Sequence, residues 1–258
     1  MFELFRKFSL LMLLFMVVMG TYLAARNSTD WREPLWVKVY PINGDGRAAT
    51  DAYIKTLRPA DFQSIEAFMK NQSTRYSVTI DRPVRMFLGD ELEELPPALD
   101  KKPSILGVMS WSLKMRWWAR QMTNHHPGPA PDIRLFLIYY DPESSPTLGH
   151  SLGLQKGLIG VVNVFALRSQ GETNNFVIAH EMLHTLGATD KYDLRSNLPL
   201  YPEGYGDPER MPLYPQPNAE IMGGRIPISQ TEAVMPRSLS EASIGPATAE
   251  EIRWLSGT

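Results

Sequence analysis

The sequence predicts an α/β (α+β) chain, in which a mixed, twisted sheet packs against a buried helix and an irregular C-terminal part follows. Three observations predict this class. Runs of β-branched and aromatic residues indicate strands, and apolar residues at helical spacing lie between them. The chain also has 21 prolines, many of them between residues 196 and 246. Strands alternating with helices predict a layered α/β domain, and the prolines predict a loop-rich end.

Four segments are expected to form strands. Each is dominated by aliphatic and aromatic residues over a short run, which is typical of strands buried in a sheet. In chain order they are Leu35–Tyr40, Val84–Leu88, Ile133–Tyr140 and Gly157–Phe165.

Three segments are expected to form helices. Pro59–Lys70 places Phe62, Ile65 and Phe68 on one face. Ser104 can cap a longer helix that runs to about Met122. The third helix, Asn175–Leu186, is followed by Gly187, a residue typical of helix C-termini.

The N-terminal region is a separate unit. Phe8–Ala25 is an uncharged run of 18 residues, preceded by Arg6 and Lys7. About 17–25 apolar residues span a bilayer, so residues 8–25 are expected to be a transmembrane signal anchor. Residues 1–7 would be cytoplasmic and the remainder would lie outside the cytoplasm. Secretion after signal cleavage is the alternative, although Leu23-Ala24-Ala25 is a poor cleavage site.

The rest of the chain is long enough for one sizeable core. Residues 26–34 are expected to be a linker and residues 35–258 one domain, with subdomains 35–187 and 188–258. The net charge of −2 provides no basic surplus, so no nucleic-acid partner is expected. The chain has no cysteine, so any bound metal must be held by histidine, carboxylate or backbone oxygen.

One motif in the third predicted helix indicates chemistry: His180-Glu181-x-x-His184. Positions four apart lie on one face of a helix, so both imidazoles can reach a single zinc ion. Glu181 is suited to act as the general base that holds the zinc-bound water. The flanking residues are apolar, as a buried active-site helix requires: Phe176, Val177, Ile178, Ala179, Met182, Leu183 and Leu186.

A third ligand is expected shortly after the helix. Gly187 follows His184 by three residues and tolerates the left-handed conformation that ends a helix. The resulting turn can bring Asp190, six residues past His184, back toward the metal. His180, His184 and Asp190 would then leave a fourth position open, as a catalytic zinc site requires.

The pattern His180-Glu181-x-x-His184-x-x-Gly187-x-x-Asp190 resembles the zinc signature of the metzincins, in the variant with aspartate as third ligand. The resemblance implies a zincin-like fold and a zinc metalloendopeptidase with one catalytic Zn²⁺ ion, acting on a peptide or protein substrate. It also implies a methionine in a tight turn beneath the metal, for which Met222 is the candidate.

The metzincin resemblance further implies an antiparallel edge strand that pairs with extended substrate. The predicted strand Gly157–Phe165 precedes the motif helix and matches this position. Its first residues are therefore the expected substrate-binding positions: Gly157, Leu158, Ile159 and Gly160.

Three alternatives stay open on the sequence. Glu220 could replace Asp190 as third ligand, as in a gluzincin-like site. The chain could be a non-catalytic, membrane-anchored module that binds peptides or proteins on a zincin scaffold. It could also be a zinc hydrolase that cleaves a bond other than a peptide bond.

Overall fold

The computed structural model describes residues 12, 29–99, 104–123, 130–155 and 157–255. At its centre is a five-stranded sheet with the order β2-β1-β3-β5-β4. Strands β2, β1, β3 and β5 are parallel, and β4 runs antiparallel to β5 at one edge. The strands are β1 (Leu35–Asn43), β2 (Val84–Leu88), β3 (Ile133–Tyr140), β4 (Leu152–Leu154) and β5 (Ile159–Phe165).

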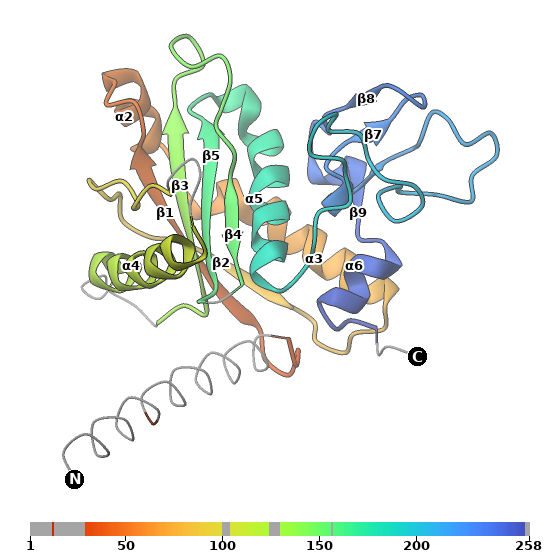
Figure 1. Cartoon of the computed structure of the whole chain (residues 1–258), viewed down its shortest axis with the longest axis horizontal. Helices are drawn as coiled ribbons and strands as arrows, with labels where there is room; N and C mark the ends of the chain where they lie inside the picture. Colours follow the sequence, from red (N-terminus) through yellow and green to blue (C-terminus); the bar gives the residue numbers. More distant parts are fainter. Residues whose placement is uncertain (1–11, 13–28, 100–103, 124–129, 156, 256–258) are drawn as a thin grey trace.

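Helices cover both faces of this sheet (Figure 1). Helix α4 lies on one face, α3 and α5 lie on the other, and the C-terminal part packs against α5. The helices are α2 (Ala48–Ile54), α3 (Gln63–Arg75), α4 (Ile105–Thr123), α5 (Gly171–Thr185) and α6 (Pro246–Glu251). Short 3₁₀ turns are η1 (Pro59–Phe62), η2 (Arg168–Gln170), η3 (Ile221–Gly223) and η4 (Leu239–Glu241). The C-terminal part adds the two-residue strands β6 (Ala219–Glu220), β7 (Ile226–Pro227), β8 (Ala233–Val234) and β9 (Ala242–Ser243).

The predicted mixed α/β class is confirmed. Strands β2 and β3 have the expected bounds, and α4 and α5 begin and end within a few residues of the predicted helices. The helix expected from Pro59 divides into η1 and α3, because Pro59 starts a separate 3₁₀ turn. Helices α2 and α6 and strand β4 were not predicted. Each is too short to show a hydrophobic period in the sequence.

The expected edge position of Gly157–Phe165 is wrong. Strand β5 lies inside the sheet, because β3 pairs with one side of it in parallel and β4 pairs with the other side in antiparallel. The residues expected to bind substrate are therefore not at a free edge: Gly157, Leu158, Ile159 and Gly160. The antiparallel edge is β4, only three residues long and containing Gly153, so its sequence carries little strand signal.

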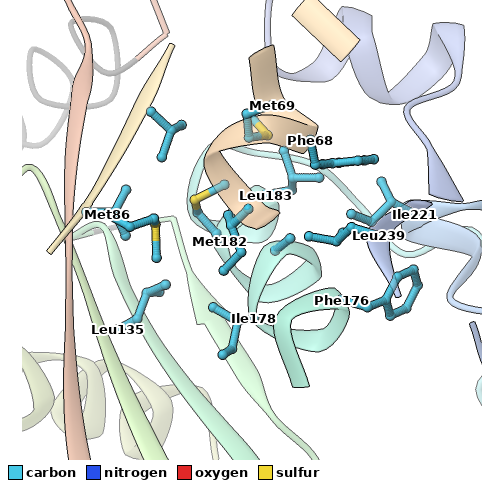
Figure 2. Close-up of a cluster of buried hydrophobic side chains, with 14 of the residues drawn as sticks. Phe68, Met69, Met86, Leu135, Phe176, Ile178, Met182, Leu183, Ile221 and Leu239 are labelled. Atoms are coloured by element: carbon cyan, nitrogen blue, oxygen red, sulfur yellow. The ribbon is translucent and has the colours of Figure 1, made fainter. Parts of the chain in front are cut away.

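Helix α5 is buried between the sheet and the C-terminal part, as Figure 2 shows. Ile178 and Met182 of α5 point toward Met86 and Leu135 of the sheet. On its other side α5 meets side chains from α3 and from the C-terminal part, namely Phe68, Met69, Ile221 and Leu239. Both expected subdomains thus contribute to one continuous core, which leaves α5 almost no freedom to shift.

The segment expected to be a linker is anchored at Trp31. This side chain is buried, its Nε1 donates to the carbonyl oxygen of Ile252 at 2.7 Å, and its ring packs edge-on against Trp254. Trp31, within the segment expected to be a linker over 26–34, therefore packs against the domain. The start of the domain is tied to its C-terminal end.

The expected transmembrane segment 8–25 lies, apart from Met12, outside the described residues, as do residues 1–7. Among the helices that the structure describes, none combines the length and the apolar character needed to cross a bilayer.

We expect Trp31→Ala to lower the free energy of unfolding by about 3 kcal/mol, because it empties a buried aromatic site and leaves a carbonyl without its donor. Urea denaturation of the full chain measures the change. Trp117→Ala is the matched control, because Trp117 is 64% exposed and its loss leaves no cavity. Equal effects of the two substitutions would contradict the packing role of Trp31.

Candidate metal centre

Helix α5 places His180 and His184 one turn apart on the same face. Their Nε2 atoms are 3.1 Å apart, and their rings are nearly perpendicular, with centroids 4.7 Å apart. The spacing of four residues produces this arrangement, because it returns to one face of a helix after a single turn.

The helix ends in the way the sequence predicts. Gly187 has φ +107°, its N–H donates to the carbonyl oxygen of His184, and the N–H of Ala188 donates to that of Leu183. These two bonds form a Schellman motif, in which glycine occupies the left-handed position. A side chain at residue 187 would be strained by this φ and would also meet Gln155. The chain therefore reverses here, toward the face that carries the histidines.

The reversal brings Asp190 to the two histidines. Its Oδ1 lies 3.2 Å from Nε2 of His180 and 3.1 Å from Nε2 of His184. Together with the 3.1 Å between the two Nε2 atoms, these distances form a nearly equilateral triangle of three potential ligand atoms. The three side chains thus share one point in space, as the motif predicts.

The protonation of the imidazoles follows from their other contacts. Nδ1 of His180 is 2.9 Å from the carbonyl oxygen of Ile221, and Nδ1 of His184 is 2.8 Å from that of Ala188. A carbonyl oxygen accepts but does not donate, so each Nδ1 carries the proton and each Nε2 of a neutral ring keeps its lone pair. Lone pairs of two Nε2 atoms and a carboxylate oxygen then face one another, an arrangement that a cation stabilises.

Glu181 lies beside this triangle. Its carboxylate is within 4.8 Å of the ligand atoms of the two histidines, and the group His180, Glu181 and His184 could hold a metal ion. The side chain is buried, and among the described residues none donates a hydrogen bond to its Oε2. Burial raises the pKa of this carboxyl, against the opposing effect of the two histidines. A buried oxygen that lacks a partner is expected where a bound group supplies one.

Charges within the site shift the pKa values of its members. Burial raises the pKa of Asp190, but the two imidazoles that face its carboxylate, when protonated, outweigh burial and lower the pKa well below its usual range. Burial lowers the pKa of His180, but the carboxylates of Asp190 and Glu181 outweigh it and the pKa is raised. Burial and the same two carboxylates raise the pKa of Tyr192 to about 12, so its hydroxyl stays protonated at neutral pH.

The segment that carries Asp190 is held on both sides. The backbone N–H of Thr189 and the buried ammonium of Lys191 both donate to Oε2 of Glu251 in α6, at 3.0 and 2.8 Å. The backbone N–H of Lys191 donates to the carbonyl oxygen of Met222 at 2.9 Å. Helix α6 and the turn at Met222 therefore fix the backbone on either side of Asp190.

Glu220 is not placed to bind a metal with the histidines. Its carboxylate is completely buried and accepts four hydrogen bonds, from the N–H groups of Met222, Gly223 and Gly245 and from the hydroxyl of Thr248. Burial raises its pKa, and the four donors act against this shift. Glu220 thus joins the 220–224 turn to the start of α6.

Met222 lies in η3, within that turn, and is fully buried. The carbonyl oxygen of the preceding residue, Ile221, is the one that holds His180, and Gly224 closes the turn with φ +73°. The turn therefore contacts α5 at His180, through the residue that precedes Met222.

A cavity of about 680 Å³ opens beside the histidines. Its walls include the segment before β4, the end of β5, helix α5 as far as Glu181, Tyr192 and Asn197, the 223–225 turn and residues 235–237. Among the described residues that line it, Glu181 is the only carboxylate, whereas Arg225 and Arg237 are cationic. A substrate in this cavity would reach His180 and Glu181 directly.

Strand β4 forms the floor of the site on the sheet side. A Cβ atom at Gly153 would clash with the Cβ of His184 and with the carbonyl oxygen of Glu181, so only glycine permits this approach. The segment before β4 lies alongside β5, because the side-chain amide of Asn163 in β5 donates to the carbonyl oxygens of Gly149 and His150. The backbone from Gly149 to β4 thus borders both the cavity and helix α5.

Sequence reasoning did not identify several of these contributors. Gly153, Glu251 and Arg225 lie far from the motif in the chain and have no motif of their own. Tyr192 also lines the cavity. The neighbouring Asp193 accepts hydrogen bonds from the backbone of Arg195 and Ser196 in a loop turn.

The chain matches no model of a known protein family, and no curated protein has a significantly similar sequence.

The bond between Lys191 and Glu251 makes stability depend on pH. Burial raises the pKa of Glu251, but Lys191 and Thr189 outweigh it and the folded-state pKa lies below the unfolded value of about 4.3. The stabilisation is therefore complete above the unfolded pKa and is lost as the pH falls through the folded pKa.

We expect Glu251→Gln to lower Tm at about pH 7 and to leave Tm less sensitive to acid, so that the two melting curves approach each other near pH 3. Thermal unfolding of both full-length proteins across this range measures the difference. Glu250→Gln is the control, since Glu250 is the exposed neighbour of Glu251. A constant difference in Tm at every pH would rule out the proposed linkage.

Proposed function

We propose that the chain is a zinc-dependent peptidase that hydrolyses peptide bonds, with His180, His184 and Asp190 as zinc ligands and Glu181 as general base. The observation that carries this proposal is the convergence of the two Nε2 atoms and Oδ1 of Asp190, at 3.1–3.2 Å from one another. The resemblance of the motif to the metzincin signature supports it.

The residues present fit zinc. Ligand atoms about 2.0–2.1 Å from a tetrahedral zinc ion lie about 3.3 Å apart, close to the distances between these three atoms. Two neutral imidazoles and a carboxylate are accepted zinc donors, and three protein ligands leave a position for water. The carbonyl oxygens at Nδ1 supply the outer contacts that orient such histidines.

A bound zinc ion would polarise the scissile carbonyl group and lower the pKa of the attacking water. Glu181 would accept a proton from this water on Oε2, to which no described residue donates, as the water oxygen bonds to the carbonyl carbon, and would pass the proton to the amide nitrogen as the C–N bond breaks. Burial raises the pKa of the Glu181 carboxyl, which makes it a better proton acceptor. The hydroxyl of Tyr192, protonated at this pH, lines the same cavity.

Two features support a peptide as substrate. Strand β4 ends the sheet, so its outer backbone groups are available to pair with an extended peptide. It also touches the motif helix at His184 through Gly153, which would place a paired peptide beside the catalytic residues. The antiparallel direction of β4 agrees with the edge strand that the metzincin resemblance implies, although β5 was expected in that place. Membrane anchoring by residues 8–25 remains part of the proposal, with the peptidase domain outside the cytoplasm.

We expect Glu181→Gln to bind one zinc ion per chain but to hydrolyse peptides about 10²–10⁴-fold more slowly, because it removes only the proton acceptor. The measurements are metal content by elemental analysis and cleavage of a peptide library by the full chain. Glu172→Gln at the start of α5 is the matched control and should keep full activity. Full activity of Glu181→Gln would refute the catalytic role. Zinc binding without hydrolysis in the unmodified chain would favour the non-catalytic binding module.

The choice of third ligand can be tested separately. We expect Asp190→Asn to weaken zinc binding by more than the 10–100-fold typical for loss of an outer contact. Glu220→Gln should instead lower the free energy of unfolding, because the neutral amide accepts its four donors less well, while the folded fraction still binds zinc. Zinc titration and urea denaturation of both variants make the comparison. The opposite pattern would assign Glu220 as the ligand.

A further inference from the structure

Helix α4 lies on the face of the sheet opposite to α5 (Figure 1). It carries a stripe of exposed apolar side chains. Leu106, Met109, Leu113 and Trp117 are 76%, 59%, 57% and 64% exposed. Their spacings of three, four and four residues place them along one side of the helix. The helix buries its other side against the sheet through Trp111, Met115, Trp118 and Ala119. The stripe is thus additional to the face that the fold uses.

The charges of α4 have a single sign. The helix contains Lys114, Arg116 and Arg120 and no aspartate or glutamate. At 100° per residue, Lys114 and Arg116 lie on the two sides of the stripe, and Arg120 extends it by one turn. Aromatic and aliphatic residues between flanking cations are typical of helices that lie in the interface of a membrane with anionic lipids.

The position of α4 suits a chain that is attached to a membrane near its N-terminus. The C-terminal end of α4 lies at the end of the sheet where β1 begins, since Arg134 in β3 donates to the hydroxyl of Thr123. At the same end, the backbone N–H of Trp36 in β1 donates to the carboxylate of Asp132. Strand β1, the first strand of the sheet along the chain, therefore begins at the end of the sheet where α4 ends.

We propose that α4 lies on the surface of an anionic lipid bilayer, with its apolar stripe below the headgroups and its basic residues among them. Together with residues 8–25, α4 would give the domain a second contact and hence one orientation relative to the bilayer. The proposal does not depend on the peptidase activity.

Charge also decides against a second copy of the chain as the occupant. If two α4 stripes faced each other, Lys114 and Arg120 of both copies would come together, and α4 offers no carboxylate to pair with them. Phosphate groups of an anionic membrane surface provide the opposite charge along the whole stripe.

The absence of cysteine from the chain makes a direct test possible. Met109→Cys and Leu113→Cys each provide one site for a nitroxide label in the full-length protein. Gln230→Cys, at an exposed position in the β7–β8 turn, is the control. Each labelled protein is reconstituted into phosphatidylcholine vesicles with phosphatidylglycerol, and collision of the label with oxygen and with a water-soluble nickel complex is measured.

We expect the nitroxides at 109 and 113 to collide mainly with oxygen, at a depth of about 5–10 Å below the headgroups, and the label at 230 to collide mainly with the nickel complex. In vesicles of phosphatidylcholine alone, or with the double substitution Lys114→Glu and Arg120→Glu, the labels at 109 and 113 should collide mainly with the nickel complex. Labels at 109 and 113 that collide with the nickel complex as often as the label at 230 would overturn the proposal. Dipolar broadening between labels would do the same, because it would show pairing of two copies.

Discussion

The candidate metal centre depends on two hydrogen bonds, each between an imidazole and a backbone carbonyl oxygen. The carbonyl oxygens of Ile221 and Ala188 accept the Nδ1 protons of His180 and His184, and this turns both Nε2 atoms inward. Neither carbonyl belongs to the motif helix. One comes from the C-terminal part and the other from the turn after Gly187. The ligand geometry is therefore a property of how these segments pack on α5.

Two carboxylates of the C-terminal part hold that packing in place. Glu220 accepts donors from its own turn and from the start of α6, and Glu251 at the end of α6 accepts donors from both neighbours of Asp190. The two carboxylates accept hydrogen bonds that water would otherwise accept. Irregular backbone can therefore pack here without leaving donors unpaired. The C-terminal part, poor in regular structure, thus supports the backbone on both sides of Asp190, the proposed third ligand.

The two faces of the sheet have different surroundings. One face supports α5, the cavity and the C-terminal part, whereas the other carries α4 with its unpartnered apolar stripe (Figure 1). The sheet separates the proposed catalytic cleft from the proposed membrane contact. Contact of α4 with a bilayer would consequently leave the residues that line the cavity free for substrate.

The sequence by itself determined the local features of this protein. The spacing of four positions from His180 to His184 places both on one helical face, glycine at 187 permits the left-handed turn, and long apolar runs such as Ile133–Tyr140 form strands. These outcomes depend on neighbours in the chain, so pattern and spacing are sufficient to predict them.

The tertiary structure decided which distant groups meet. Only packing showed that β4 and not β5 forms the edge of the sheet, since a three-residue strand exists because its partner is already in place. Packing also chose between two carboxylates of similar chemistry: Asp190 faces the histidines, whereas Glu220 is enclosed by four donors. Contacts between residues tens of positions apart produce no periodic pattern in the sequence. The geometry of the site depends on such contacts, so only the folded chain shows it.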